Sequence, residues 1–302
     1  MPAPILTLAD LASWSHAGPS LAVLGHPISH SLSPPMHNAA LAALAPADAR
    51  FRDWEYFRFD VPPDDLPRAL EVLHAKKFCG LNLTVPHKVI AFDRVARVDP
   101  AARPVGAVNT LRWAADGWEG FNTDGYGLAA ALRATLGRDL AHADVLVLGA
   151  GGAARGAAVE CLQRRCRSLW IANRTRENLD ALLAVVTPLA GGIPVRGFPP
   201  TAIPRDLPAG AVVINATSAG LRPDDAPPID LATLPRPAAV FDMIYNPPLT
   251  ALLGAAAALG LPHANGLAML AHQGAKSLEI WTGVAAASTV AVMSRAAAAA
   301  GQ

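Results

Sequence analysis

The sequence predicts an α/β protein whose clearest part is a doubly wound parallel sheet, and three observations support this prediction. Residues 145–148 form a continuous apolar run, as expected of a strand buried on both faces of such a sheet. This run leads directly into a glycine-rich turn at residues 149–152, followed by a helical segment and a second apolar strand at residues 168–172. Further apolar strands then alternate with helical segments, which indicates a parallel sheet with helices on both faces.

Length, charge and cysteine content narrow the class of protein. A chain of 302 residues is long enough for two domains. Its formal net charge of +1 produces no electrostatic potential that would attract nucleic acid or an anionic membrane. We see no signal peptide in residues 1–10 and no apolar stretch long enough to span a membrane. The three cysteines, Cys79, Cys161 and Cys166, show no metal-ligand spacing, and their odd number argues against a disulfide framework. We therefore expect a cytoplasmic protein without a bound metal, with Cys161 and Cys166 on one helix.

The first strand is expected at residues 21–24, and the stretch G-H-P-I-S-H-S-L-S-P follows it. Ser33 before Pro34 is typical of a helix N-cap with proline at the first helical position, and a helix over residues 36–44 follows. Two interpretations of the serines stay open at this point. They cap the helix, or the hydroxyls of Ser31 and Ser33 bind a substrate carboxylate at the helix N-terminus.

A strand over residues 51–59 and a helix up to residue 74 precede the stretch N-L-T-V-P-H-K. Apolar residues in this stretch alternate with Asn82 and Thr84, so these two polar side chains share one face of a strand. Pro86 ends the strand, and Lys88 falls in the first turn of a helix that is expected to reach Val95. Lys88 is either a solvated lysine or a catalytic proton acceptor.

A further strand over residues 106–111 carries Asn109, and a hairpin turn is expected at residues 116–117. A helix over residues 126–136 follows, with Thr123 or Asp124 as its N-cap. In the alternative interpretation, Asp124 is paired with Lys88. A hydride leaves an alcohol carbon only as the hydroxyl proton is removed, and a lysine close to an aspartate can accept that proton at neutral pH.

The glycine-rich turn reads G-x-G-x-x-A from Gly149 to Ala154, which is typical of a Rossmann-type dinucleotide-binding turn. Gly149 allows the tight turn, Gly151 lets the backbone approach a pyrophosphate, and the N–H groups of the following helix bind that phosphate. The second strand ends in N-R-T-R at residues 173–176, where an NAD-binding turn would have a carboxylate for the ribose. Because two guanidinium groups suit a phosphate better than a free diol, NADP is predicted rather than NAD.

The remaining strands are expected at residues 194–197, 212–214 and 239–245. Two polar stretches, N-A-T-S-A-G and M-I-Y-N, stand at carboxyl ends of these strands, where such sheets bind ligands. Asn265 and Gly266 start a last long helix, with Gln273 beside its apolar stripe. Gln273 is either exposed or turned towards a cleft. The alanine-rich run at residues 296–300 is expected to be a frayed terminus.

Together these stretches resemble the shikimate dehydrogenase family, from Leu21 to about Gly283. The motifs that carry the resemblance occur in the family's order, and they are G-H-P-I-S-H-S-L-S-P, N-L-T-V-P-H-K, G-A-V-N-T, N-T-D-G, G-A-G-G-A-A-R-G, N-R-T, N-A-T-S-A-G, D-M-I-Y-N-P and N-G-L-A-M-L-A-H-Q-G-A. Ala268 stands where the family commonly has glycine, and Ala251 where proline is frequent. These departures concern packing more than chemistry.

The resemblance implies a role for each residue singled out above. Lys88 would be the catalytic acid and base, and Asp124 its partner. The substrate would be bound by Ser31, Ser33, Thr84, Lys88, Asn109, Asp124, Tyr245 and Gln273. NADP would be bound by Gly149, Ala150, Gly151, Gly152, Ala153, Asn173, Arg174, Thr175, Arg176, Met243 and Gly266.

The resemblance also implies an architecture and a reaction. Residues 1–123 with 265–302 would form an α/β substrate-binding and catalytic domain, and residues 124–264 a Rossmann-type NADP domain. The reaction would be the reversible reduction of 3-dehydroshikimate to shikimate in aromatic amino-acid (chorismate) biosynthesis. The alternatives are a quinate/shikimate dehydrogenase that uses NAD or NADP, and a non-catalytic nucleotide-binding regulator. The oligomeric state is left open, with a homodimer among the options.

Overall fold

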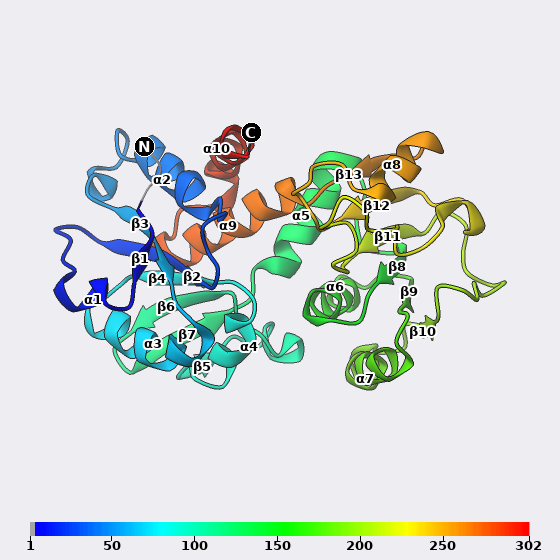
Figure 1. Cartoon of the computed structure of the whole chain (residues 1–302), viewed down its shortest axis with the longest axis horizontal. Coiled ribbons are helices and arrows are strands. Elements are labelled where there is room, and N and C mark those ends of the chain that lie inside the picture. The colour runs from blue at the N-terminus through cyan, green and yellow to red at the C-terminus, as the bar shows by residue number, and fades with distance from the viewer. Residues whose placement is uncertain (1–3, 302) are drawn as a thin grey trace. The chain divides into compact units, whose positions relative to one another are not determined.

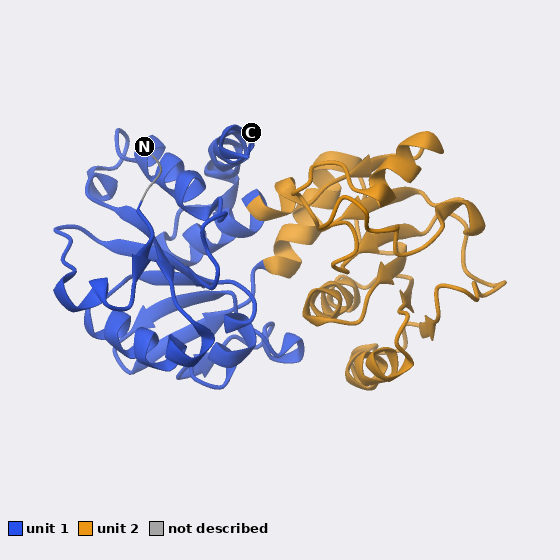
Figure 2. Ribbon diagram, viewed as in Figure 1, with its two compact units in different colours: residues 1–123, 271–302 blue, residues 124–270 orange. Residues whose placement is uncertain are grey.

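The computed structural model describes residues 4–301 and contains two compact units (Figure 1, Figure 2). Unit 1 comprises Met1–Thr123 and Ala271–Gln302, and unit 2 comprises Asp124–Leu270. The chain therefore leaves unit 1 after Thr123 and returns to it within a helix. Each unit contains one β-sheet with helices of its own.

The sheet of unit 1 is mixed, with the strand order β1-β3-β2-β4-β6-β7-β5. Its strands are β1 (Leu6–Thr7), β2 (Ser20–Gly25), β3 (Glu55–Asp60), β4 (Gly80–Leu83), β5 (Arg97–Val98), β6 (Thr110–Ala114) and β7 (Gly117–Phe121). Strands β1, β3, β2 and β4 are parallel to one another, whereas β6 is antiparallel to both β4 and β7. The β6–β7 hairpin turns at the predicted position, and β1 is a strand that the sequence did not indicate.

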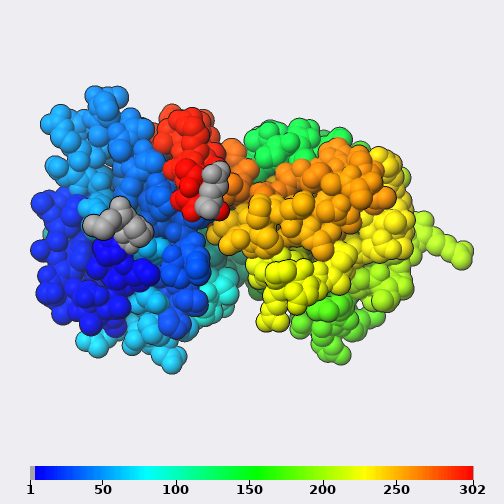
Figure 3. Space-filling model, turned by 45° about the horizontal axis from the view of Figure 1, so that its top comes forward, coloured from blue at the N-terminus to red at the C-terminus, as the bar shows by residue number. Residues whose placement is uncertain are grey.

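The helices of unit 1 are α1 (Asp10–Ser13), α2 (Ser33–Leu44), α3 (Leu66–Ala75), α4 (His87–Phe92), most of α9 (Leu267–Thr282) and α10 (Val290–Ala300). Ser33 is the first residue of α2, and Leu32 occupies the N-cap position. The prediction of a frayed C-terminal run was wrong. That run belongs to α10, which packs against α2 and buries Met293 and Ala297. Figure 3 shows α10, in red, at the molecular surface.

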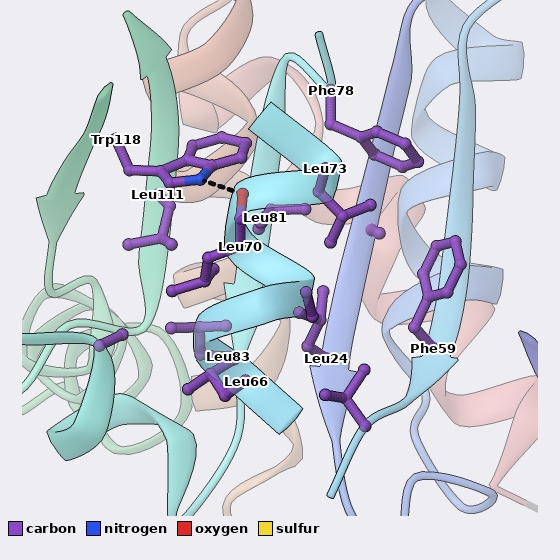
Figure 4. Packing of buried hydrophobic residues seen from close by; sticks show 14 of the residues in the cluster. Leu24, Phe59, Leu66, Leu70, Leu73, Phe78, Leu81, Leu83, Leu111 and Trp118 are labelled. Atoms are coloured by element: carbon purple, nitrogen blue, oxygen red, sulfur yellow. Dashed lines mark hydrogen bonds between the residues drawn. The ribbon is translucent and has the colours of Figure 1, made fainter. Parts of the chain in front are cut away.

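A hydrophobic core lies between α3 and the sheet of unit 1 (Figure 4). Helix α3 buries Leu66, Leu70 and Leu73, which recur with helical spacing. Trp118 of β7 packs into the same cluster, and its Nε1 donates a hydrogen bond of 3.0 Å to the main-chain oxygen of Leu70. Full burial of one such leucine contributes about 1.5–3 kcal/mol. This core therefore fixes the sheet that carries the candidate substrate residues.

The sheet of unit 2 is parallel throughout, with the strand order β10-β9-β8-β11-β12-β13. Its strands are β8 (Asp144–Leu148), β9 (Ser168–Ala172), β10 (Val195–Phe198), β11 (Val212–Asn215), β12 (Ala239–Asp242) and β13 (His263–Ala264). The chain adds strands outward from β8 on one side and then on the other, so the order reverses between β8 and β11. This topology confirms the predicted doubly wound parallel sheet.

The helices of unit 2 are α5 (Asp124–Leu136), α6 (Gly152–Gln163), α7 (Arg176–Val186) and α8 (Ala251–Ala258). Helix α6 contains Cys161 but ends before Cys166, so the expectation that both lie on one helix was wrong. The left-handed backbone of Arg165, with φ of 61°, turns the chain away from the helix axis. All three cysteines lie in the described part of the chain and are free. Across residues 4–301, no helix is both long and apolar enough for a membrane crossing.

Candidate functional site

The predicted substrate residues of unit 1 follow strands that end at one edge of the sheet. Gly25 of β2 pairs in register with Asp60 of β3, and Leu24 pairs with Leu83 of β4, so these carboxyl ends are aligned. Asn109 lies at the same edge, because its main-chain oxygen accepts a hydrogen bond of 2.9 Å from the N–H of Leu83. The residues that follow the ends of β2 and β4 are Ser31, Ser33, Thr84 and Lys88.

The two serines make different contacts at the start of α2. Ser31 is half-buried, and its Oγ accepts a hydrogen bond of 3.3 Å from the main-chain N–H of Ser33. Ser33 is buried and is itself the first residue of α2. The capping interpretation therefore describes Ser31, which satisfies an N–H of the first helical turn, but not Ser33.

Main-chain hydrogen bonds fix Lys88 at this edge. Its N–H donates to the main-chain oxygen of Thr84 at 3.2 Å, and its own oxygen accepts from the N–H of Val108 at 2.9 Å. The side chain of Thr84 lies against Gly25, where an added Cβ would be 2.2 Å from Thr84 Oγ1. The side chain of Lys88 is half-buried on the short helix α4, which ends three residues before the predicted end at Val95. The backbone of Lys88 is thus tied both to β4 and to the segment that leads into β6.

Asn109 and Gln273 are in direct contact although they are 164 positions apart in the sequence. The Nδ2 of Asn109 donates to the Oε1 of Gln273 at 3.3 Å, and its Oδ1 accepts from the main-chain N–H of Thr123 at 2.9 Å. Asn109 is 2% exposed and Gln273 is 9% exposed. Gln273 is therefore not an ordinary exposed glutamine.

A buried hydrogen-bond network extends from this pair to side chains that the sequence did not mark as functional. The hydroxyl of Tyr56 donates to the Oδ1 of Asn82 at 2.8 Å. The Nδ2 of Asn82 donates to the hydroxyls of Thr110 and Ser277 at 3.1 and 3.0 Å. The hydroxyl of Thr110 in turn donates to the Oδ1 of Asn109 at 2.9 Å. Strand alternation placed Asn82 on a polar face, but no sequence signal indicated its partners.

The predicted cofactor residues of unit 2 also follow strands that end at one edge of a sheet. Leu148 of β8 pairs in register with Ala172 of β9 and with Asn215 of β11, and Asn215 pairs with Asp242 of β12. The glycine-rich turn, the N-R-T-R segment, the N-A-T-S-A-G loop and Met243 begin at these strand ends. The point where the strand order reverses is therefore lined by these segments, as expected of a ligand site in such a sheet.

The glycine-rich turn leaves space for a phosphate group. Gly149 has a φ of +110°, and a Cβ there would lie 3.0 Å from the side chain of Thr217 and 3.1 Å from the main-chain oxygen of Ala216. At Gly151 and Gly152, an added Cβ would have open space, with nothing else described within 4 Å. Helix α6 starts at Gly152, and no side chain in residues 4–301 caps it. These features fit the pyrophosphate of a dinucleotide at the helix N-terminus.

The two arginines of the N-R-T-R segment have different surroundings. Arg174 is exposed. Arg176 forms an ion pair with Asp180 one turn later on α7, with 2.8 Å between Nε and Oδ2, and this carboxylate raises the pKa of Arg176. The Nδ2 of Asn173 donates to the main-chain oxygen of Thr175 at 2.8 Å, which holds the turn in shape. A phosphate at this segment would therefore compete with Asp180 for Arg176.

Met243 and Gly266, both predicted to bind the cofactor, contact each other. An added Cβ at Gly266 would lie 2.1 Å from the main-chain oxygen of Met243, so only glycine fits there. The N–H of Gly266 donates to the main-chain oxygen of Ile244 at 3.0 Å. Tyr245, on the same loop, is half-buried, and burial raises the pKa of its hydroxyl.

Asp242 connects the loops after β11 and β12, a role that the sequence did not indicate. It is fully buried, and its carboxylate accepts hydrogen bonds from the Nδ2 of Asn215 at 3.0 Å, the N–H of Ile244 at 3.0 Å and the hydroxyl of Thr250 at 2.7 Å. The Oδ1 of Asn215 accepts from the hydroxyl of Thr217 at 2.8 Å. Burial raises the pKa of Asp242, although these hydrogen bonds act in the opposite direction.

Asp124 is the first residue of α5 and belongs to unit 2, whereas Lys88 belongs to unit 1. The next residue, Gly125, packs against Glu160 of α6, where an added Cβ would lie 2.4 Å from the Oε2 of Glu160. Glu160 is 9% exposed and forms an ion pair of 2.7 Å with Arg164. The close approach to α6 fixes the position within unit 2 at which Asp124 begins α5. The pairing of Lys88 with Asp124 stays a prediction.

The fold and these two sets of residues define a class of protein. A parallel sheet with a glycine-rich turn at its reversal point is typical of dinucleotide-binding proteins, and unit 1 adds polar side chains and a lysine suited to an alcohol or ketone substrate. Within residues 4–301, no three or more His, Cys, Asp or Glu side chains are grouped so that they could hold a metal ion. The class is that of the dinucleotide-dependent oxidoreductases.

Comparison with known proteins specifies the family. Residues 23–111 match the shikimate dehydrogenase substrate binding domain, residues 131–221 match shikimate/quinate 5-dehydrogenase, and residues 266–297 match the shikimate 5'-dehydrogenase C-terminal domain. The shikimate dehydrogenase (NADP(+)) of Citrifermentans bemidjiense is 41% identical over 264 residues, which cover 86% of this chain and 89% of that protein. The chain belongs to the shikimate dehydrogenase family, which confirms the resemblance seen in the sequence.

Solved structures agree with this assignment. A shikimate dehydrogenase in complex with NADP+ is 32% identical, with a TM-score of 0.81 and coverage of 99% of both chains. The shikimate 5-dehydrogenase of Thermus thermophilus, in complex with NADP(H) and shikimate, is 35% identical, with a TM-score of 0.81 over 93% of this chain and 99% of that chain. These similarities confirm the predicted α/β fold with a Rossmann-type sheet.

Proposed function

We propose that this protein is an NADP-dependent shikimate dehydrogenase that reversibly reduces 3-dehydroshikimate to shikimate, a step of aromatic amino-acid (chorismate) biosynthesis. The observation that carries the proposal is the 41% identity, over most of both chains, to relatives named shikimate dehydrogenase (NADP(+)). These relatives support an oxidoreductase that acts on a CH–OH group with NADP, as the sequence predicted.

The polar edge of unit 1 supports recognition of a hydroxylated carboxylate. We assign Ser31 and Ser33 to the carboxylate, because hydroxyl groups at the start of α2 can donate hydrogen bonds to it. We assign Thr84, Asn109 and Gln273 to ring hydroxyls, which both donate and accept hydrogen bonds. Tyr245, Lys88 and Asp124 complete the set of proposed substrate residues.

Lys88 and Asp124 carry the proton transfer in this proposal. When shikimate is oxidised, the hydrogen on the reacting carbon leaves as hydride with both electrons of the C–H bond. The O–H bond also breaks, and its electron pair forms the second bond of the ketone C=O. The hydroxyl proton passes to Nζ of Lys88, which returns it in the reduction of 3-dehydroshikimate. Asp124 would stabilise the protonated lysine and orient the hydroxyl. The hydrogen bonds of the Lys88 backbone to Thr84 and Val108 restrict where Nζ can reach.

When bound, NADP supplies the nicotinamide that accepts or donates the hydride. Its pyrophosphate would be held by residues 149–153, whose turn has the space described above. Its 2'-phosphate would be held by residues 173–176, with Arg174 as the exposed cation and Arg176 shared with Asp180. Met243 and Gly266 are the remaining proposed cofactor residues.

Quinate dehydrogenation is the second candidate function, because one of the matched family models is named for both shikimate and quinate. Quinate has an additional hydroxyl and a tetrahedral carbon beside its carboxylate. Initial rates with shikimate or quinate, each with NADP or NAD, distinguish the two candidates. We expect the highest kcat/KM for shikimate with NADP. A preference for quinate with NAD would refute the proposal.

We also propose that the protein is cytoplasmic and that its two domains bind different ligands. All three cysteines are free thiols, which suits the reducing cytoplasm. Residues 1–123 with 265–302 would bind the substrate, and residues 124–264 would bind NADP. The second compact unit ends at Leu270 rather than at residue 264, because the first turn of α9 clusters with unit 2. A homodimer is the oligomeric state to test first, by sedimentation velocity.

A further inference from the structure

The buried network of unit 1 connects the predicted substrate residues to one another through side chains that do not belong to the predicted set. We propose that Tyr56 is a positioning residue for the dehydrogenase reaction, acting on Asn109 and Gln273 through Asn82. This inference rests on the proposed function, because it concerns how the same site binds shikimate.

Hydrogen-bond directions around Tyr56 follow from the chemistry of its partners. The Nδ2 of Asn82 lies 3.1 Å from the main-chain oxygen of Asn109, which can only accept, so this atom of Asn82 is the amide nitrogen. The Oδ1 of Asn82 therefore faces Tyr56 and accepts its hydroxyl proton at 2.8 Å. Tyr56 thereby fixes the orientation of the Asn82 amide.

The directions of the hydrogen bonds at Asn109 and Gln273 can be assigned in the same way. The main-chain N–H of Thr123 donates to Asn109, which identifies that atom as Oδ1 and turns the Nδ2 of Asn109 towards Gln273. The Oε1 of Gln273 therefore serves as an acceptor, which fixes the orientation of its side-chain amide. Asn82 links this end to Tyr56 through Thr110, whose hydroxyl donates to the Oδ1 of Asn109. One ordered series of hydrogen bonds thus leads from Tyr56 to Asn109 and Gln273.

Neighbouring side chains confine the ring of Tyr56. It is 1% exposed, and the ring of His37 is stacked on it with 4.2 Å between the centroids and 2° between the planes. Trp281 of α9 packs nearby, with its ring centroid 6.2 Å from that of Tyr56. The phenol ring is therefore confined by neighbours from α2 and α9, and the hydroxyl is its only polar atom.

Removal of this hydroxyl should weaken shikimate binding more than the chemical step. In Tyr56→Phe, the Oδ1 of Asn82 loses its buried donor, so the Asn82 amide and the residues that it orients lose order. An interaction made equally with bound substrate and transition state raises KM and leaves kcat unchanged. We expect the KM for shikimate to rise about tenfold, with kcat within about twofold of wild type and the KM for NADP unchanged.

The test is steady-state kinetics of wild type, Tyr56→Phe and the control Ser168→Ala. Ser168 is a buried residue of unit 2 whose hydroxyl donates to Asp144 at 2.7 Å and accepts from the Nε1 of Trp170 at 3.0 Å. Ser168→Ala removes a buried hydroxyl outside the proposed site, so this variant should keep the wild-type KM for shikimate. An unchanged KM in Tyr56→Phe, or the same rise in Ser168→Ala, would overturn the positioning role.

A second variant keeps the inference testable where Tyr56→Phe does not fold. Ser277→Ala removes the other hydroxyl that binds the Nδ2 of Asn82 and leaves Tyr56 intact. We expect a rise of about threefold in the KM for shikimate, and an unchanged KM would overturn the proposal. Lack of shikimate turnover in the wild type would instead refute the proposed function. Turnover in the wild type with no change in the variants would refute the positioning role alone.

Discussion

His37 makes the stability of unit 1 sensitive to acid. This histidine is fully buried, and neither ring nitrogen has a hydrogen-bond partner in residues 4–301. Burial lowers the pKa of His37 from 6.5 to about 3, because the charged imidazolium would lose its hydration. The folded protein therefore keeps His37 neutral in a pH range in which the unfolded chain binds a proton.

The sign and size of the effect follow from proton linkage. The stability contribution of neutral His37 is fully present above pH 6.5 and is lost as the pH falls from 6.5 towards 3. At pH 5, protonation of the unfolded chain favours unfolding by about 2 kcal/mol relative to pH 7. Burial also lowers the pKa of His87 and of His272, so the wild type has further contributions of the same sign.

A substitution separates His37 from these other groups. His37→Phe retains a ring that can stack on Tyr56 but cannot be protonated. We expect the free energy of unfolding to fall between pH 7 and pH 5 by about 2 kcal/mol more in the wild type than in His37→Phe. The absolute stability of the variant does not enter this difference.

Urea unfolding followed by tryptophan fluorescence measures the effect in the appropriate unit. Of the six tryptophans, only Trp170 belongs to unit 2, so the signal reports mainly on unit 1. The tryptophans of unit 1 are Trp14, Trp54, Trp113, Trp118 and Trp281. An equal loss of stability in wild type and His37→Phe would refute the reasoning, since it would mean that His37 is not held neutral by burial.

Three further predictions concern unit 2. Gly266→Ala should raise the KM for NADP about tenfold or more, because its Cβ would lie 2.1 Å from the oxygen of Met243, and unchanged cofactor kinetics would contradict this. Arg174→Gln should raise the KM for NADP about tenfold but not that for NAD, because the 2'-phosphate loses a cation, and equal changes for both cofactors would count against the assignment. Gly125→Ala should destabilise unit 2 by about 1–3 kcal/mol through its clash with Glu160, and native-state hydrogen exchange of the amides of unit 2 is the readout.

The parts of the fold that could be predicted from the sequence depend on local patterns. The apolar run of β8 and the glycines after it specify a strand, a turn and a helix within one short segment, and the structure confirms all three. The resemblance to a known family then supplied the candidate residues of unit 1, many of which are too far apart in the sequence for any pattern to relate them.

The features that were missed depend on tertiary packing. Asn82 and Ser277 are 195 positions apart, and strand alternation indicates the face of a polar residue but not its partner. Helix α10 consists largely of alanine and gives little periodic signal, so only its packing on α2 shows that it is ordered. Asp242 resembles any residue at the end of a strand until its buried partners are known.

The most direct test of the central claim is the rate of NADPH formation from shikimate and NADP by wild type and by Lys88→Ala. The wild type should turn over, and Lys88→Ala should lose about 10²–10⁴-fold in kcat while its KM for NADP stays close to that of the wild type, because the proton acceptor is gone but the cofactor site is intact. Absence of shikimate oxidation by the wild type, or equal turnover by Lys88→Ala, would contradict the account.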